Sequence, residues 1–314
     1  MCLTSSFIKS FKSAWVSLDL SVFELGGTEA EEWLQGQITN DLRGVKLGGI
    51  TRILSTCFCN QKGHIQFDGF LIPKQDKWLV LISRGKAPLF EKRVMDYVVA
   101  EDVSCVLRHY NCWVVFDDES LQVASEQVIL ISDFEVSNGI DDLVPYFTKG
   151  ALLVLLEADF QPNCSISDSD SKIVGLRLKQ GFPDPNKYSE SILFPQELGL
   201  TYERTHVSFQ KGCYLGQEVI MRIHSKGNVH REWVRVISDT PFQIGEKLYY
   251  GQQETIGMVL ETGQVDEQHY IGSLIARRVV LQSLGLGDDI GPRENEDSQQ
   301  ISLKRGDGAE VRIV

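Results

Sequence analysis

The sequence lacks the short motifs that mark several common enzyme classes. Its 314 residues contain no GxGxxG, Walker A, HExxH or GxSxG pattern. Such motifs have fixed spacings because phosphate-binding turns, zinc-binding histidine pairs and nucleophile turns each require a particular backbone geometry. The sequence therefore offers no support for a Rossmann or P-loop nucleotide site, a zinc protease or a serine hydrolase.

Long hydrophobic runs are also absent. A membrane-spanning helix needs roughly 20 consecutive apolar residues, whereas the longest run here, Ala151 to Leu156, ends at the charged Glu157. We predict that this run is a core strand or a short helix. Lys9 and Lys12 near the N-terminus are not followed by the continuous apolar segment of a secretion signal. We therefore expect a cytoplasmic protein that has no membrane partner.

Cysteine pairs with metal-site spacing are missing. The seven cysteines are scattered and include no CxxC pair, which is typical of reduced thiols and argues against a zinc ribbon. Cys57 and Cys59 would share one face of a strand, and we interpret them as two small buried side chains. His224 and His230 have no ligand spacing with other candidate residues, so we expect no resident metal.

Positive charge is in short supply. Lys and Arg number 31 against 43 Asp and Glu, and the formal net charge is −12. Because non-specific nucleic-acid binding depends on many Lys and Arg contacts to phosphate, this balance disfavours direct tRNA binding. One local exception is the basic cluster Lys211, Arg222, Lys226, Arg231 and Arg235. It is suited to the acidic tail of a ligand or to a phosphate, or it forms a solvated surface.

The pattern of apolar residues predicts an α+β protein with more than one domain. A helix is expected to begin near Thr28 and run through Leu34, and a second covers Lys86 to Val98. The predicted strands of this part are Ser17 to Leu25, Arg52 to Cys59, His64 to Ile72, Trp78 to Ile82, Val103 to Arg108 and Cys112 to Phe116. Gln161 to Lys172, rich in Ser and Asp, is predicted to be a surface loop.

The character of the chain changes after residue 228. Short strand candidates separated by turn residues follow, and they indicate a small β-barrel or sandwich. They are Trp233 to Ile237, Glu246 to Tyr250, Thr255 to Glu261, Tyr270 to Arg278, Ile301 to Arg305 and Ala309 to Val314. We therefore predict an α+β region over residues 1–228 and a C-terminal β-barrel over residues 229–314.

The segment Lys211 to Glu218, KGCYLGQE, holds the clearest candidate for chemistry. Gly212 and Gly216 flank Cys213, and glycine suits a sharp turn or a close backbone approach. A helix predicted from Gln217 would place Cys213 near a helix N-terminus, where Lys211 would further favour the thiolate. From the residues alone, a reactive and partly exposed thiol and a buried thiol on a tight turn are both open.

This segment resembles the signature of the YgfZ family, which comprises tetrahydrofolate-binding relatives of the glycine-cleavage T-protein. Other segments are similar to family elements in the same order, and the resemblance covers Ser17 to Arg235. They are Leu34 to Asp41 (LQGQITND), Asn60 to Asp68, Gly175 to Pro183 and Phe194 to Glu197. His64 departs from the arginine that is usual in the family.

The resemblance implies a ring-like arrangement of domains around a central folate cavity, in which residues 1–228 form two interleaved subdomains and the C-terminal β-barrel closes the ring. It implies a tetrahydrofolate-binding accessory factor in iron–sulfur cluster assembly or repair, rather than a typical enzyme. Its partners would be iron–sulfur client or assembly proteins, including radical enzymes that modify tRNA. The alternative is a folate-dependent one-carbon transferase like the T-protein, which does not carry the KGCYxGQE signature.

The same resemblance assigns candidate site residues. Cys213 is the motif thiol, and Lys211 and Tyr214 complete its catalytic setting. The candidates for binding tetrahydrofolate or a derivative are Thr39, Asn40, Gln61, Arg177, Gln217 and Glu218. A carboxylate that reads the pterin is also expected, and Asp68, Glu197 and Glu218 remain open for that role.

Overall fold

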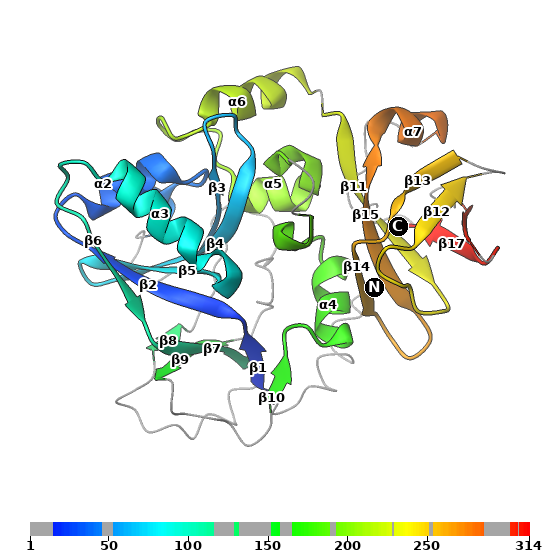
Figure 1. Ribbon diagram of the computed structural model, residues 1–314, viewed down its shortest axis with the longest axis horizontal. Helices are drawn as coiled ribbons and strands as arrows, with labels where there is room; N and C mark the ends of the chain where they lie inside the picture. The colour runs from blue at the N-terminus through cyan, green and yellow to red at the C-terminus, as the bar shows by residue number, and fades with distance from the viewer. Residues whose placement is uncertain are drawn as a thin grey trace. The chain divides into compact units, whose positions relative to one another are not determined.

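The computed structural model describes residues 15–45, 53–115, 129–131, 152–157, 165–188, 193–227, 229–250, 254–285, 302–306 and 308–314 (Figure 1). The chain divides into two compact units, each made of segments that are distant in sequence. The first unit consists of Met1–Gln61, Gln66–Asp168 and Thr205–Gln217. The second consists of Lys62–Ile65, Ser169–Arg204 and Glu218–Val314. The predicted division at residue 228 stays a prediction, and Asn228 lies outside the described residues.

The first unit contains a five-stranded sheet in the order β3-β4-β5-β2-β6. Its strands are β2 (Leu20–Gly26), β3 (Leu54–Cys59), β4 (Ile65–Lys74), β5 (Lys77–Ser83) and β6 (Ser104–Arg108). Two helices, α2 (Ala30–Gln37) and α3 (Ala87–Tyr97), belong to the same unit. These elements correspond to the strands and helices predicted for this part of the chain, apart from the predicted strand end at Arg52, which lies outside the described residues.

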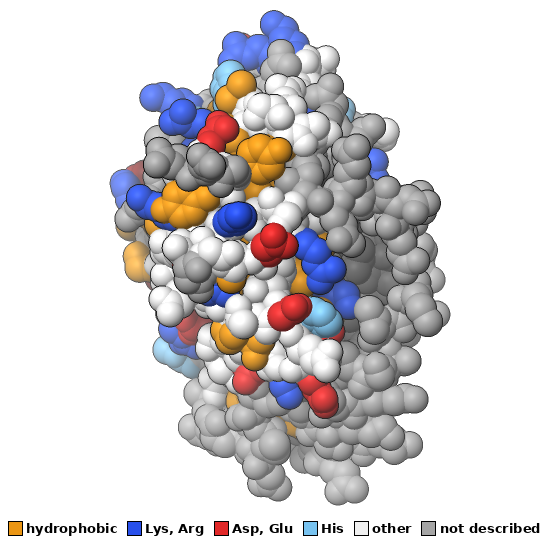
Figure 2. All heavy atoms as spheres, turned by 90° about the vertical axis from the view of Figure 1, so that its right-hand side faces the viewer, with side chains coloured by type: hydrophobic (Ala, Val, Ile, Leu, Met, Phe, Trp, Pro, Cys, Tyr) orange, Lys and Arg blue, Asp and Glu red, His pale blue; other side chains and the backbone are white. Residues whose placement is uncertain are grey.

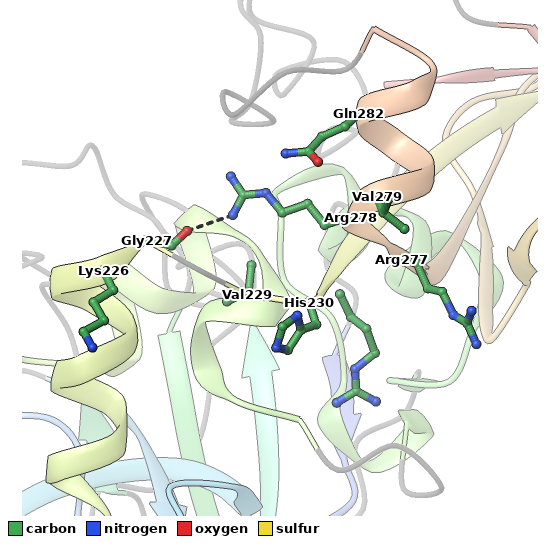
Figure 3. A pocket seen from close by; sticks show the side chains of 9 residues that line it. Lys226, Gly227, Val229, His230, Arg277, Arg278, Val279 and Gln282 are labelled. Atoms are coloured by element: carbon green, nitrogen blue, oxygen red, sulfur yellow. Dashed lines mark hydrogen bonds between the residues drawn. The ribbon is translucent and has the colours of Figure 1, made fainter.

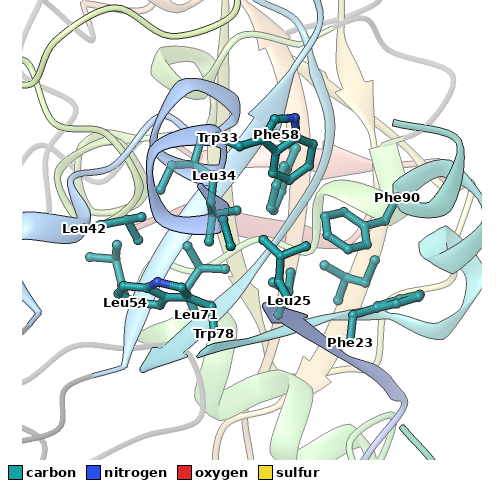
Figure 4. Close-up of a cluster of buried hydrophobic side chains, with 14 of the residues drawn as sticks. Phe23, Leu25, Trp33, Leu34, Leu42, Leu54, Phe58, Leu71, Trp78 and Phe90 are labelled. Carbon is teal, nitrogen blue, oxygen red and sulfur yellow. The ribbon is translucent and has the colours of Figure 1, made fainter. Parts of the chain in front are cut away.

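The core of this unit follows from the spacing of apolar residues. In α2, Ala30, Trp33, Leu34 and Gln37 are buried at the i, i+3, i+4 and i+7 spacing of one helix face. Trp33 and Leu34 join an apolar cluster with residues of the sheet and of α3 (Figure 4). Burial of each large side chain contributes about 1.5–3 kcal/mol. This packed core holds the C-terminal end of α2 in place.

A second sheet of the first unit has the order β10-β1-β7-β9-β8. Its strands are β1 (Trp15–Leu18), β7 (Tyr110–Val115), β8 (Ile129–Ile131), β9 (Leu152–Glu157) and β10 (Ser165–Ser167). The single strand predicted from Ser17 is thus divided at Asp19, whose backbone N–H donates to the Asp168 carboxylate at 3.0 Å. This break passes the chain from one sheet to the other. The predicted strand ends at Phe116 and Ala151 lie outside the described residues.

The prediction of a surface loop from Gln161 to Lys172 was wrong in part. β10 pairs in parallel with β1, and α4 (Ser171–Lys179) begins before the predicted loop ends. The Ser-Ile-Ser sequence of β10 has too little apolar pattern to indicate a strand, so its pairing depends on the neighbouring β1. The Asp170 side chain accepts a hydrogen bond from the Lys172 N–H and caps α4.

The second unit contains a curled, half-barrel sheet in the order β13-β12-β16-β17-β11-β15-β14 (Figure 1). Its strands are β11 (Arg231–Ser238), β12 (Lys247–Tyr250), β13 (Glu254–Met258), β14 (Glu261–Gln264), β15 (Tyr270–Arg277), β16 (Ser302–Arg305) and β17 (Glu310–Ile313). Gly175 of α4 and Gly263 of β14 mark a close approach of the two elements. A Cβ added at Gly175 would overlap the backbone of Gln264, and one added at Gly263 would overlap the backbone of Gly175. The strands expected after residue 228 are present, except that the single strand predicted from Thr255 to Glu261 is divided into β13 and the start of β14. The predicted start at Ile301 lies outside the described residues.

The remaining helices are short. They are α5 (Leu200–His206), α6 (Gln217–Lys226) and α7 (Arg278–Ser283), with the 3-10 turns η1 (Leu42–Gly44), η3 (Arg84–Lys86), η5 (Pro185–Tyr188) and η6 (Pro195–Leu198). α6 confirms the helix predicted from Gln217. Within the described ranges, every helix is too short or too polar to cross a lipid bilayer.

Candidate functional site

In the first unit, Lys211 connects the motif loop to the C-terminal end of α2. Its Nζ donates to the carbonyl oxygens of Gln35 and Ile38 at 2.7 Å each, and to that of Asn40 at 2.8 Å. The last carbonyls of a helix lack partners within the helix, and a cation at that end is electrostatically favourable. The Leu215 N–H adds a fourth link by donating to the Gly36 carbonyl at 3.0 Å. The motif loop is therefore anchored on the residues at which α2 ends.

The charge of Lys211 is set by two opposing effects. Burial lowers the pKa of its ammonium to about 7, while the nearby Asp41 carboxylate acts to raise that pKa. Three carbonyl acceptors match the three N–H donors of the protonated form. The Nζ also lies 5.0 Å from the centre of the Tyr214 ring, within the range of a cation–π contact. Lys211 therefore titrates near neutral pH at the base of the motif.

Thr39 and Asn40 are buried and hold three segments together. The Thr39 hydroxyl donates to the His206 carbonyl at 2.6 Å and accepts from the Cys57 N–H at 3.0 Å. The Asn40 amide donates to the carbonyls of Ser55 at 2.8 Å and Thr205 at 2.9 Å. The segment after α2, strand β3 and the end of α5 are thus joined by polar side chains. The predicted contact of Thr39 and Asn40 with folate stays a prediction.

Tyr214 contributes a buried hydroxyl that no described residue satisfies. The side chain is 7% exposed, and its Oη has no hydrogen-bond partner. The Ser55 Oγ on β3 is unsatisfied in the same way. Burial, reinforced by the Cys59 and Cys57 thiols, raises the pKa of Tyr214 well above its usual value, so the hydroxyl keeps its proton. A buried polar atom without a partner costs free energy, and such atoms often mark a ligand position.

Cys213 is exposed, which corresponds to the first of its two predicted settings. The residues around it form a turn that leads into α6. Gly216 has a φ of 86°, a value that glycine adopts without strain. The Gln217 side chain donates to the Gly212 carbonyl at 3.3 Å. The turn therefore presents the thiol to solvent, and its reactivity stays a prediction.

The other described cysteines differ from Cys213 in burial. Cys57 and Cys59 are buried on β3, which confirms their interpretation as small core side chains. Burial raises the pKa of the thiols of Cys59, Cys105 and Cys112 to about 12. These thiols carry little thiolate at neutral pH and are poorly reactive. Cys2 and Cys164 lie outside the described residues.

Arg177 lies in the second unit, where it forms a buried ion pair with Glu261. Its guanidinium also donates to the Phe182 carbonyl at 2.6 Å. Glu261 in turn accepts from the Tyr188 hydroxyl at 2.6 Å and from the Asp184 N–H at 3.0 Å. This network ties α4 and η5 to β14, and the predicted folate contact of Arg177 is not tested by it.

The remaining predicted residues are exposed or partly exposed. Gln61 is exposed on the turn between β3 and β4, and Glu218 is exposed in α6 of the second unit. Gln217 is half-buried at the start of α6. The structure therefore brings together Lys211, Tyr214, Thr39 and Asn40 in the first unit. It does not include Gln61 in that cluster.

The three carboxylates left open by the sequence have different environments. Glu197 is buried, and it accepts hydrogen bonds from Arg231 at 3.1 Å and from the Phe194 N–H at 3.0 Å. Asp68 on β4 is half-buried in the first unit, and its carboxylate lies 4.0 Å from the His206 Nε2. Ser55 in β3 and His206 at the end of α5 were not singled out from the sequence, because a single polar residue carries no recognisable pattern.

The chain is similar in sequence to several known bacterial proteins. No protein-family model matches the chain. An uncharacterised protein of Haemophilus influenzae is 25% identical over 225 residues, which covers 68% of this chain and 70% of that protein. The tRNA-modifying protein YgfZ of Colwellia psychrerythraea is 26% identical over 257 residues, covering 72% and 73%. The protein of that name from Buchnera aphidicola is 22% identical over 315 residues, covering 90% and 92%.

Among solved structures, the chain is similar to aminomethyltransferase T of the glycine cleavage system from Bartonella henselae. The TM-score is 0.66 at 11% identity, and the match covers 98% of this chain and 86% of that protein. Such an identity shows a shared fold and no more. The predicted resemblance to YgfZ proteins and to the T-protein is therefore confirmed.

Proposed function

Because this YgfZ-like chain has the fold of aminomethyltransferase T, we propose that it binds a folate and supports iron–sulfur enzymes that modify tRNA. The Colwellia and Buchnera relatives are named as tRNA-modifying proteins. Folate binding is supported by one observation, the buried Tyr214 hydroxyl of the motif loop, which has no hydrogen-bond partner among the described residues. A hydroxyl of this kind gains most from a ligand that supplies the missing hydrogen bond.

The residues of the first unit fit the hydrogen-bonding groups of a folate. The pterin ring presents an amino-pyrimidinone edge, whose N–H groups suit a carboxylate and whose oxygen and ring nitrogen accept hydrogen bonds. Asp68 would accept from the N–H groups, and the Tyr214 hydroxyl would donate to an acceptor of the ligand. Asp68 is the carboxylate we assign to this role, because it belongs to the same unit as Tyr214, whereas Glu197 and Glu218 belong to the second unit.

Lys211, Thr39 and Asn40 would support the site from behind. Lys211 fixes the loop on α2, and Thr39 and Asn40 hold the wall formed by β3 and the end of α5. A bound tetrahydrofolate would supply a reduced pterin that accepts a one-carbon unit. The chain's own contribution is therefore to bind the ligand and orient it.

Cys213 would act on the client protein. Its exposed thiol can lose a proton to solvent, and the resulting thiolate can donate an electron pair to an iron atom of a client cluster. Such a bond is a transient ligation, which breaks when a client cysteine takes over the iron. Replacing Cys213 with Ala should therefore lower the activity of cluster-dependent tRNA-modifying enzymes in cells, and full activity would sink this step.

Folate binding is tested by a single-atom change. Tyr214→Phe removes the unsatisfied hydroxyl and keeps the ring, so the variant should be at least as stable as wild type in urea. Its affinity for tetrahydrofolate, measured by calorimetry, should fall about fivefold to tenfold, the worth of one hydrogen bond. Tyr250→Phe, on an exposed position of the second unit, is the matched control. Equal affinity of the two variants would contradict the assignment of Tyr214.

A folate-dependent one-carbon transferase is the second candidate, and it is favoured by the fold match to aminomethyltransferase T. That reading needs a carboxylate beside the folate amine, and Asp68 is the candidate in the first unit. Turnover of an aminomethyl-lipoyl carrier protein with tetrahydrofolate distinguishes the two functions. Turnover that Asp68→Asn abolishes would replace the accessory function by the transferase.

A further inference from the structure

A basic cavity of about 1070 Å³ lies within the second unit (Figure 3). It is formed where α6 ends, where β11 begins and where β15 passes into α7. Its described lining residues are Lys226, Gly227, Val229, His230, Arg231, Arg277, Arg278, Val279 and Gln282. None of these is acidic, although the whole chain has a formal net charge of −12. The described lining of the cavity is therefore positive in an otherwise acidic chain.

The cationic side chains of this cavity differ in how they are held. Lys226 and Arg277 are exposed and form no ion pair or side-chain hydrogen bond with other described residues. Arg278 donates to the Gly227 carbonyl at 2.9 Å, which holds its guanidinium at the edge of the cavity. Arg231 is bound to Glu197, so its charge is offset. Among the described residues, Lys226 and Arg277 are therefore the cations available to a ligand of this cavity.

The pairing of β11 with β15 brings two arginines of the cavity to neighbouring positions. Arg231 lies directly opposite Arg277 in this antiparallel pair. Because Glu197 offsets the charge of Arg231, Arg277 is the arginine of the pair whose charge is available to a ligand. On the face drawn in Figure 2, Lys and Arg side chains predominate in the upper part, and acidic side chains lie mainly at the centre and below. A concave surface with one sign of charge attracts ions of the opposite sign.

A second cavity, of about 760 Å³, shares Arg231 and Arg277 with the basic one. Its remaining lining is mainly apolar and includes Ile256, Met258, Leu260, Ile275 and Val280, together with one acidic residue, Glu254, and one further cation, Lys187. Apolar walls beside a few placed polar groups are typical of small-molecule sites. A ligand that fits both cavities carries an anionic group at one end and an apolar, ring-like group at the other.

We propose that the two cavities form one binding site for a nucleoside phosphate, free or within RNA. Lys226 and Arg277 hold the phosphate oxygens, and a guanidinium group suits such oxygens because it donates two parallel hydrogen bonds. The base lies against the apolar wall that contains Met258. All of these residues belong to the second unit, and the proposal does not depend on folate binding in the first.

Titration of the full chain with three probes tests this site. The probes are inorganic tripolyphosphate, ATP and a single-stranded RNA oligonucleotide, each added to wild type and to the double variant Lys226→Glu, Arg277→Glu. Lys172→Glu, Arg312→Glu is the matched control, because it makes the same charge change at exposed positions of the same unit that line neither cavity. We expect the first variant to weaken all three probes about tenfold or more and the control to change them less than about threefold.

The apolar wall is tested by Met258→Gln, at a position that is 41% exposed and therefore tolerant of substitution. This variant should weaken ATP and RNA and leave tripolyphosphate unchanged. RNA bound more tightly than ATP would identify RNA as the source of the nucleotide. ATP bound as tightly as RNA, or more tightly, would identify a free nucleotide.

Three results would overturn the proposal. The first is equal loss of binding in the two charge variants, and the second is no binding of ATP or RNA by wild type. The third is that wild type binds a folate polyglutamate but none of the three probes, and that the Lys226→Glu, Arg277→Glu variant loses this binding. The cavity would then be a site for the folate tail. Circular dichroism and urea unfolding of each variant separate loss of binding from loss of folding. Tyr214→Phe should leave nucleotide binding unchanged, so a failure here is distinct from a failure of folate binding.

Discussion

The Nζ of Lys211 donates a hydrogen bond to the Ile38 carbonyl at 2.7 Å, which joins two residues 173 positions apart in sequence. Ile38 is the residue at which α2 gives way to extended backbone. The motif lysine is thus part of the structural support for the loop that presents Cys213. Its predicted effect on the Cys213 thiolate stays a prediction, and its structural effect can be measured separately.

Lys211→Met should lower the free energy of unfolding by about 2–4 kcal/mol, because three buried carbonyl oxygens lose their donor. Methionine keeps most of the length and the apolar stem of the side chain. Urea unfolding of the full chain measures the change, and Lys304→Met on an exposed position of β16 should change it by less than about 0.5 kcal/mol. A variant as stable as this control would contradict the structural role.

The stabilising effect of Lys211 should depend on pH. Its pKa is lowered to about 7 in the folded chain from a usual value of 10.5. Between these values the unfolded chain binds more protons than the folded chain, so the free energy of unfolding rises with pH. The difference in stability between wild type and Lys211→Met should therefore increase from pH 7 upward and be constant at lower pH. A difference that stays constant from pH 7 to 10 would mean that the three carbonyls keep the lysine charged.

Cys213 should react with iodoacetamide before the other described cysteines. It is exposed, whereas Cys59, Cys105 and Cys112 have thiols whose pKa is raised to about 12 by burial. Peptide mass spectrometry after brief alkylation of the folded chain measures each site separately. Alkylation in urea is the control, since all cysteines should then react at similar rates. Faster labelling of Cys59 than of Cys213 in the folded chain would show that the motif thiol is not accessible.

Arg177→Met should destabilise the chain by about 3–5 kcal/mol, because it leaves Glu261 as a buried carboxylate without its cation. Glu261→Gln removes the charge but keeps an acceptor for Tyr188. The double variant should lose less stability than the sum of the two single variants, and urea unfolding of all four proteins gives the coupling. Additive losses would show that the ion pair contributes little.

The same four proteins also test the predicted folate contact of Arg177. If the arginine acts only within its buried network, Arg177→Met that remains folded should bind tetrahydrofolate as wild type does. Selective loss of binding, with the fold retained in circular dichroism, would support the predicted contact instead.

Much of the secondary structure could be predicted from local pattern. α2 was predicted from the capping position at Thr28 and the apolar spacing of Trp33 and Leu34, and the hairpin of β3 and β4 from the turn at Gly63. β10 and α5 were not predicted, because neither has an apolar pattern strong enough to stand out. Elements that depend on a neighbouring segment for their stability leave little trace in their own residues.

The sequence by itself determined the local elements, the family resemblance and the glycine-framed turn around Cys213, because each depends on residues close together in the chain. Only the tertiary structure decided that Lys211 donates hydrogen bonds to carbonyls at the end of α2, that Glu261 is the partner of Arg177 and that Arg231 lies opposite Arg277. Each of these pairs joins segments far apart in the chain. Whether a charged residue is buried, paired or exposed depends on which segments pack around it, and that is set by the whole fold.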